Sequence, residues 1–106
     1  MNRNLQKIAD HYGLNNQLSM LIEESAEFTQ AVSKYRRGIV KDMNSIKEEL
    51  SDILVVAEQL KYLLGESEIE GIMNSKIDRQ LDRIRKESIC NKIEKIKIKV
   101  RGKNND

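Results

Sequence analysis

The sequence predicts a single all-α domain that is built from long helices rather than from many short strands. Proline is absent from the 106 residues and only five are glycine, so few positions would interrupt a helix. Charged residues make up 34% of the chain, which is typical of helices with broad solvated faces. Along most of the chain, apolar residues recur every three or four positions and therefore share one side of a helix.

Four helical segments are expected within one domain, residues 1–106. The first covers about residues 3–12 and ends at Gly13, a residue type that suits a helix C-terminus. The second covers about residues 16–37 and the third about residues 45–64. Because the linker between the second and third segments is short, they should pack antiparallel as a hairpin.

The fourth segment covers about residues 67–87, and a basic tail follows from about residue 90 to residue 106. The apolar residues of the tail are spaced as in a helix, but residues 95–100 also alternate as in a strand. We expect a helix whose last six residues fray. Ser45 and Glu48 predict a capping box at the start of the third segment.

The expected core is thin for a chain of this length. There is no Trp, one Phe and three Tyr, so aliphatic residues must supply most of the buried apolar surface. The apolar stripes of one chain outnumber the surfaces available to cover them. We therefore expect a homodimer or a homotetramer.

Several features bear on the compartment. Cys90 is the only cysteine, which excludes an intrachain disulfide framework. The N-terminus lacks the apolar run of a signal peptide, and no stretch approaches the ~20 apolar residues of a membrane span. We expect a cytoplasmic protein that does not contact a membrane.

Two pairs of acidic residues with helical spacing are the main functional feature. Glu24 precedes Glu27 by three residues in the second segment, and Glu49 precedes Asp52 by three in the third, so each pair lies on one side of its helix. At ~100° per residue, these acids lie beside or within otherwise apolar faces. Burying four unpaired carboxylates together is costly, so either cations neutralise them or their pKa values rise.

Oxygen-rich sites of this kind suit Mg²⁺, which could then accept phosphate oxygens. An acidic run on a helix is, however, often a solvated surface with partners four residues away. Periodicity alone leaves both interpretations open.

The pattern Glu23-Glu24-x-x-Glu27, followed by Glu49-x-x-Asp52, resembles the E-E-x-x-E…E-x-x-D signature of the MazG superfamily of all-α nucleoside triphosphate pyrophosphohydrolases. The resemblance covers about residues 13–83 and implies a four-helix-bundle type fold whose helices are completed by oligomerisation. It also implies that four carboxylates of the signature bind metal and that its first acid orients the site or positions water. The implied metal ligands are Glu24, Glu27, Glu49 and Asp52, and the first acid is Glu23.

The resemblance also implies a reaction. A (deoxy)nucleoside triphosphate would be cleaved to the monophosphate and pyrophosphate, as a house-cleaning step on the nucleotide pool. Mg²⁺, with Mn²⁺ as a substitute, would bind the phosphates, neutralise developing charge and lower the pKa of a bound water. A carboxylate near that water would act as the base.

Substrate contacts are expected on either side of the acids. A polar and basic stretch in the fourth segment resembles the part of the family that contacts phosphates, although a solvated basic face is the alternative. Residues near the start of the second segment are candidates for reading the nucleobase. The phosphate candidates are Asn74, Lys76 and Arg79, and the base candidate is Gln17, with His11, Tyr12 and Asn16 nearby.

Two other functions remain open. One is a non-catalytic helical interaction module with its acids on the surface and a basic patch at its C-terminal end. From residue 71 onwards there are eleven Lys or Arg against five Asp or Glu, but residues 92–103 lack the interleaved aromatics of a nucleic-acid site, so no nucleic-acid partner is expected. The other is an enzyme similar to phosphoribosyl-ATP pyrophosphatase.

Overall fold

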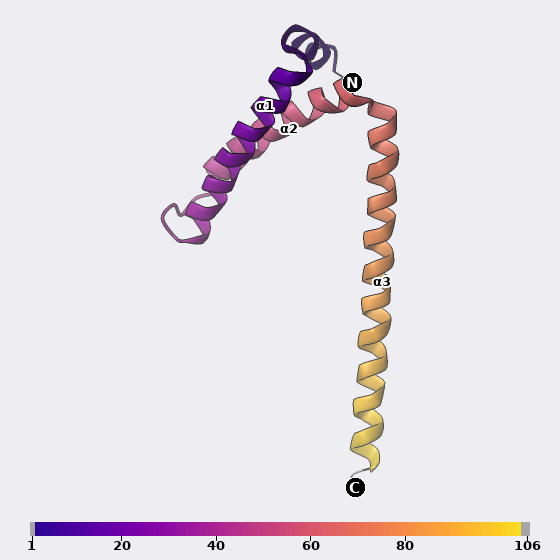
Figure 1. The fold of residues 1–106 in the computed structure, drawn as a ribbon. Coiled ribbons are helices and arrows are strands. Elements are labelled where there is room, and N and C mark those ends of the chain that lie inside the picture. Colours follow the sequence, from indigo (N-terminus) through magenta and orange to yellow (C-terminus); the bar gives the residue numbers. More distant parts are fainter. Residues whose placement is uncertain (1, 105–106) are drawn as a thin grey trace. The chain divides into compact units, whose positions relative to one another are not determined.

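The computed structural model describes residues 2–104, and this part of the chain is helical apart from short connections and contains no strand (Figure 1). Its helices are α1 (Arg3–Arg36), α2 (Asn44–Leu64) and α3 (Glu66–Asn104). The all-α prediction is therefore confirmed. The chain divides into two compact units, Met1–Ile69 and Glu70–Asp106, which are described separately below.

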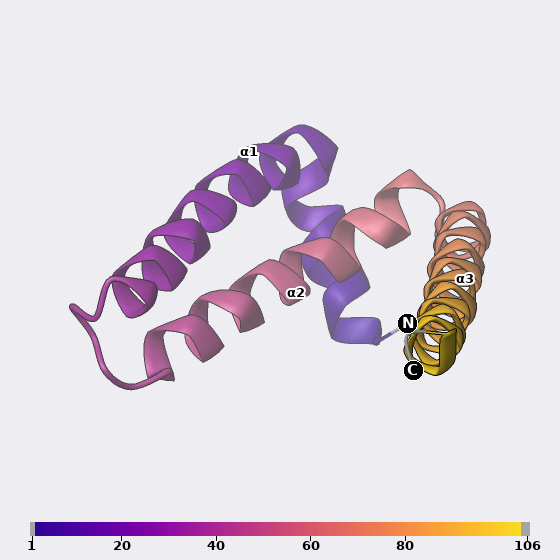
Figure 2. The same cartoon turned by 90° about the horizontal axis from the view of Figure 1, so that it is seen from below.

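Helix α1 is divided by a kink at Gly13, where the backbone adopts φ 82° and ψ 169°. A positive φ of this size favours glycine over any residue with a Cβ atom. The break was predicted at this residue, but helix resumes immediately after it instead of near residue 16. The part before the kink lies across α2 (Figure 2), where the Tyr62 hydroxyl donates a hydrogen bond of 2.9 Å to Asp10 Oδ1.

Helices α1 and α2 form the predicted antiparallel hairpin (Figure 2). The predicted capping box of Ser45 and Glu48 is wrong, because α2 begins one residue earlier than expected and Met43 occupies the N-cap without a side-chain hydrogen bond. Asp42 performs a related role, since its Oδ1 accepts a hydrogen bond of 3.0 Å from the backbone N–H of Asn44. The turn before α2 is thus held by a residue outside the predicted motif.

The core of the first unit is small, as the composition predicted. Its buried apolar side chains are Ala9, Val56 and Leu60. Leu50 and Leu54 of α2 are 41% and 55% exposed, so the side of the helix that carries them lies outside this core. The buried residues of α2 are Val56, Gln59 and Leu60. Glu49 lies on the same side of the helix and therefore faces α1.

Helix α3, which belongs to the second unit from Glu70 onwards, is one continuous helix that joins the predicted fourth segment to the tail. The strand alternative for residues 95–100 is therefore excluded. Residues 101–104 are helical rather than frayed, and the remaining two residues of that prediction lie outside the described range. No proline interrupts this stretch, and its many Lys, Arg, Glu and Ile residues tolerate a helix well.

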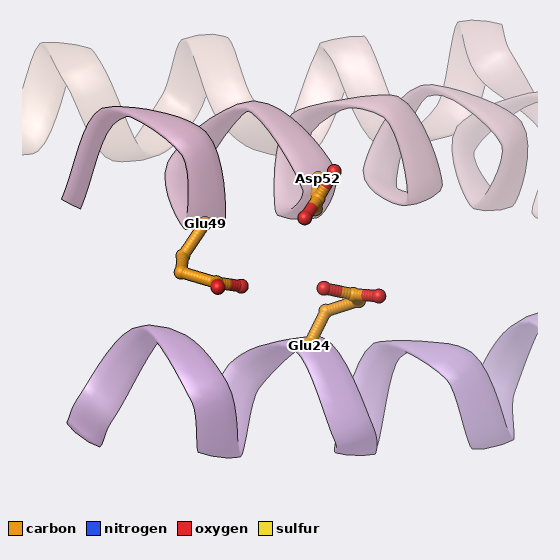
Figure 3. A group of neighbouring side chains, drawn as sticks. All are labelled: Glu24, Glu49 and Asp52. Atoms are coloured by element: carbon orange, nitrogen blue, oxygen red, sulfur yellow. The ribbon is translucent and has the colours of Figure 1, made fainter. Parts of the chain in front are cut away.

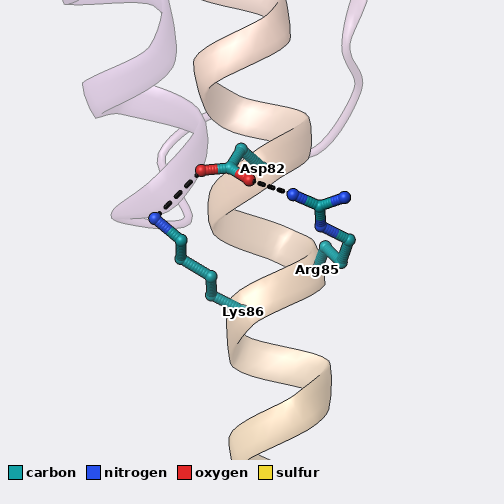
Figure 4. Close-up of polar contacts among 3 residues, drawn as sticks. All are labelled: Asp82, Arg85 and Lys86. Atoms are coloured by element: carbon teal, nitrogen blue, oxygen red, sulfur yellow. Dashed lines mark hydrogen bonds and ion pairs between the residues drawn. The ribbon is translucent and has the colours of Figure 1, made fainter.

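The polar face of α3 carries exposed ion pairs one turn apart. Asp82 pairs with Arg85 at 2.6 Å and with Lys86 at 3.0 Å (Figure 4). Such exposed pairs contribute little stability in water. Nothing in these contacts indicates a functional site.

Candidate functional site

Three of the predicted carboxylates meet between the two helices of the first unit. Glu24 extends from α1 towards Glu49 on the facing helix, and Asp52 lies one turn further along α2 (Figure 3). One carboxylate oxygen from each of these residues lies within 4.8 Å of the others. This spacing is small enough for the three oxygens to share one divalent cation.

Glu27 and Glu23 lie at the edge of this group. Glu27 is not among the three converging residues, but its charge raises the pKa of both Glu24 and Glu49, which shows that it is close to them. Glu23 is exposed and lines a cavity next to the group. All five predicted acids are therefore in or beside one site.

The electrostatics of the group are unfavourable without a cation. Burial raises the pKa of Glu24, and the charges of Glu27, Asp52 and Glu49 raise it further. Burial also raises the pKa of Glu49, with Glu27 as the next largest cause. Oε2 of Glu24 and Oε2 of Glu49 are the buried side-chain atoms without a hydrogen-bond partner in the part of the chain that the structure describes. A bound cation would give both of these carboxylate oxygens the partner that they lack.

These raised pKa values predict a pH dependence of the metal-free protein. In the folded state both carboxylates have a pKa above the ordinary value of 4.5. The folded protein therefore binds these two protons more tightly than the unfolded chain does. The stability from this term is fully present below pH 4.5 and is lost as the pH rises through the raised values. In EDTA, the free energy of unfolding should therefore fall between pH 4.5 and neutral pH by less in Glu49→Gln than in the wild type.

Urea unfolding followed by circular dichroism across this pH range measures the difference. Glu58→Gln is the matched control, because Glu58 is an exposed acid of the same helix. It should follow the wild-type pH profile. Parallel profiles for Glu49→Gln and the wild type would mean that Glu49 is not crowded in the folded state.

A cavity of about 680 Å³ adjoins the acids on the side of the Gly13 kink. Its lining combines apolar, amide and acidic side chains. Gln17 and Tyr12, two of the residues expected near the base, are part of it. The lining residues are Tyr12, Asn16, Gln17, Ser19, Met20, Glu23, Glu24, Asp52, Val55, Val56 and Gln59. His11 packs edge-to-face on Tyr12 at 4.7 Å between ring centroids.

Gln59 is the main cavity residue that the sequence analysis missed. It lies on the same line of α2 as Asp52, Val56 and Leu63, because these positions are three or four residues apart. A polar residue within an otherwise apolar line was the signal that could have identified it.

A second, smaller cavity of about 220 Å³ adjoins the acids on the side of the hairpin turn. Glu27 and Glu49 line it, together with Lys34, Gln30 and Ser45. The acidic group therefore lies between two cavities along the hairpin. Lys34 brings a positive charge to the second cavity and was also not identified from the sequence.

The predicted phosphate contacts lie in the other unit. Asn74, Lys76 and Arg79 belong to α3, and all three are exposed. Their contribution to a site with the acids stays a prediction.

Comparisons with known proteins agree with the sequence motifs. The family profile described as the MazG nucleotide pyrophosphohydrolase domain matches residues 13–97, a range that contains all the acids of the site. Searches among curated proteins and among solved structures found no significant match. Over the described part of the chain, no helix has both the length and the apolar character needed to cross a membrane.

Proposed function

The chain belongs to the MazG nucleotide pyrophosphohydrolase family, and on this basis we propose that it hydrolyses a nucleoside or deoxynucleoside triphosphate to the monophosphate and pyrophosphate with the help of Mg²⁺. The observation that carries the proposal is the convergence of Glu24, Glu49 and Asp52, with oxygens within 4.8 Å of one another. The orphaned oxygens of Glu24 and Glu49 support a cation at this position.

In the proposed site, Glu24, Glu49 and Asp52 hold the metal, and Glu27 adds a fourth carboxylate at its edge. Bound Mg²⁺, or Mn²⁺ in its place, would supply the positive charge that neutralises phosphate oxygens during the transfer. Glu23 is exposed and borders the larger cavity. It is our candidate for orienting the attacking water and accepting its proton.

The two cavities suggest how a nucleotide would bind. The larger one offers Tyr12, Met20 and Val55 as an apolar wall for a nucleobase. The phosphates would then lie at the acids and extend towards Lys34 in the smaller cavity. Asn74, Lys76 and Arg79 remain proposed phosphate contacts. A house-cleaning enzyme of this type would work on the cytoplasmic nucleotide pool.

A substrate panel tests the proposed function. Canonical, deoxy and damaged nucleoside triphosphates and phosphoribosyl-ATP are each incubated with the protein in Mg²⁺, in Mn²⁺ and in EDTA, and pyrophosphate release is measured. We expect release from at least one triphosphate, dependent on the metal. Absence of release from the whole panel would contradict the proposal and favour the non-catalytic interaction module.

We also propose that the chain forms a homodimer or homotetramer through its exposed apolar faces. Ile22 of α1 is 72% exposed and Leu54 of α2 is 55% exposed. In α3, Leu81 and Ile84 are 60% and 57% exposed. Large apolar side chains in such numbers are usually covered by another chain.

Light scattering at micromolar concentration tests this prediction. The expected mass is two or four times the 12.3 kDa of one chain. Leu81→Glu should lower the assembled fraction, because it places a charge on an apolar surface. Its matched control is Lys86→Glu on the polar face of the same helix. A monomer mass for the wild type would contradict the prediction.

A further inference from the structure

The core of the hairpin contains two buried glutamines. Gln17 of α1 is 5% exposed and Gln59 of α2 is 3% exposed. Among the residues that the structure describes, the buried apolar ones are Ala9, Val56 and Leu60. Gln17 Nε2 donates a hydrogen bond to Gln59 Oε1 across the two helices. We refer to these two residues as the amide pair.

Packing alone does not account for the amide pair. A buried hydrogen bond between two neutral groups adds little net stability, and replacing both partners with apolar groups of similar shape is often neutral or stabilising. Both glutamines also line the cavity of about 680 Å³. A ligand in this cavity would therefore meet polar atoms of both glutamines.

The amide pair has hydrogen-bonding capacity left for a ligand. The mutual bond uses Nε2 of Gln17 and Oε1 of Gln59, which leaves Oε1 of Gln17 as an acceptor and Nε2 of Gln59 as a donor. Neither is among the buried side-chain atoms without a partner, which in the described part of the chain belong to Glu24 and Glu49. Both glutamines line the cavity, so we take these two atoms as the ones that a ligand there would meet.

The position of the amide pair relative to the acids matches the shape of a nucleotide. Gln17 precedes Glu24 by seven residues, and Gln59 follows Asp52 by seven, so both glutamines lie two turns from the acids on the same faces of their helices. At ~1.5 Å per residue this is about 10 Å. A ligand with phosphates at the acids and a sugar between would bring its heterocycle to the amides.

We propose that the amide pair reads the hydrogen-bonding edge of the substrate's nucleobase, with Gln59 as a specificity-determining residue. This inference rests on the proposed function, because it takes the ligand to be a nucleotide. The edge of a base presents a donor beside an acceptor, which an acceptor and a donor held side by side complement. Gln59 also holds the amide of Gln17, so neither side chain can turn independently.

Binding of nucleoside monophosphates in Mg²⁺ tests the inference without any turnover, because the monophosphate is a product of the proposed reaction. Calorimetry with AMP, GMP, CMP and UMP should give base-dependent affinities for the wild type. The double variant Gln17→Leu/Gln59→Leu removes both amides and leaves no orphaned partner. It should bind the preferred monophosphate about 10- to 100-fold more weakly and lose most of the discrimination between bases.

Two further variants keep the experiment decisive. Gln6→Leu is the matched control on α1, outside the cavity lining, and should keep the wild-type ranking of the four monophosphates. Gln59→Glu replaces a donor with an acceptor, so it should change the ranking of the bases and not only the affinity. If circular dichroism shows that the double variant does not fold, the ranking of the bases measured with Gln59→Glu decides whether the amide pair reads the base.

The outcomes separate this inference from the proposed function. Wild-type affinities and ranking in the double variant, or an unchanged ranking in Gln59→Glu, would overturn the role of the amide pair even if the enzyme releases pyrophosphate. Equal affinity of the wild type for all four monophosphates would also overturn it. Failure of the proposed function would instead appear as no pyrophosphate release from any triphosphate in Mg²⁺, whatever the affinities for the monophosphates.

Discussion

Glu49→Gln or Asp52→Asn is expected to lower turnover by at least about 100-fold while the helical content stays that of the wild type. Each carboxylate contributes one of the converging oxygens of the acidic group. An amide has a similar shape but no charge, so it binds a divalent cation poorly. Pyrophosphate release in Mg²⁺ and circular dichroism of the same preparations measure the two quantities.

The control for this prediction is Glu58→Gln, which makes the same chemical change at an exposed position of α2. Its turnover should equal that of the wild type. In EDTA, Glu49→Gln should be at least as stable as the wild type, because it relieves the repulsion around Glu49. Full activity in both Glu49→Gln and Asp52→Asn would remove these residues from the active site.

Mg²⁺ is expected to stabilise the folded protein strongly. A cation that binds only the folded state adds about 2.7 kcal/mol at a concentration 100-fold above its Kd. For a domain of this size, each kcal/mol raises the Tm by about 4–8 °C. Thermal unfolding in increasing MgCl2 should therefore show a rise that continues with concentration. Glu24→Gln should remove most of it, because Glu24 supplies one of the orphaned oxygens.

The control for metal binding is NaCl at matched ionic strength. Screening by salt weakens repulsion between exposed acids regardless of which cation supplies it. A solvated acidic face would thus respond similarly to both salts, whereas a site responds to Mg²⁺ at far lower concentration. Equal responses to the two salts, or an unchanged response in Glu24→Gln, would contradict a metal site at this group.

The correct predictions, the helices and the pairs of acids on them, follow from the spacing of residues along the chain. The helices follow from the absence of proline and from apolar residues every three or four positions. The pairs Glu24 with Glu27 and Glu49 with Asp52 share a side of their helices because three residues make nearly one turn. A short linker then brings the two helices together as a hairpin.

The capping box and the last residues of the tail were predicted less well. Ser45 was expected to cap α2, but the helix begins at Asn44 and Asp42 holds the preceding turn. The tail continues as a helix to Asn104 instead of fraying. In both places the competing local conformations differ by only a fraction of a kcal/mol per residue, so neighbouring residues decide where a helix begins and ends.

The pattern of residues along the chain was thus enough to establish an all-α protein with acids on two adjacent helices. The register between these helices came only from the folded structure, which brings Gln17 to Gln59 and Glu24 to Glu49. That register depends on how side chains of both helices interlock and on the kink at Gly13. The spacing of residues within one helix does not contain this information. The hydrogen bond between Gln17 and Gln59 and the cavity beside the acids could therefore be identified only from the tertiary structure.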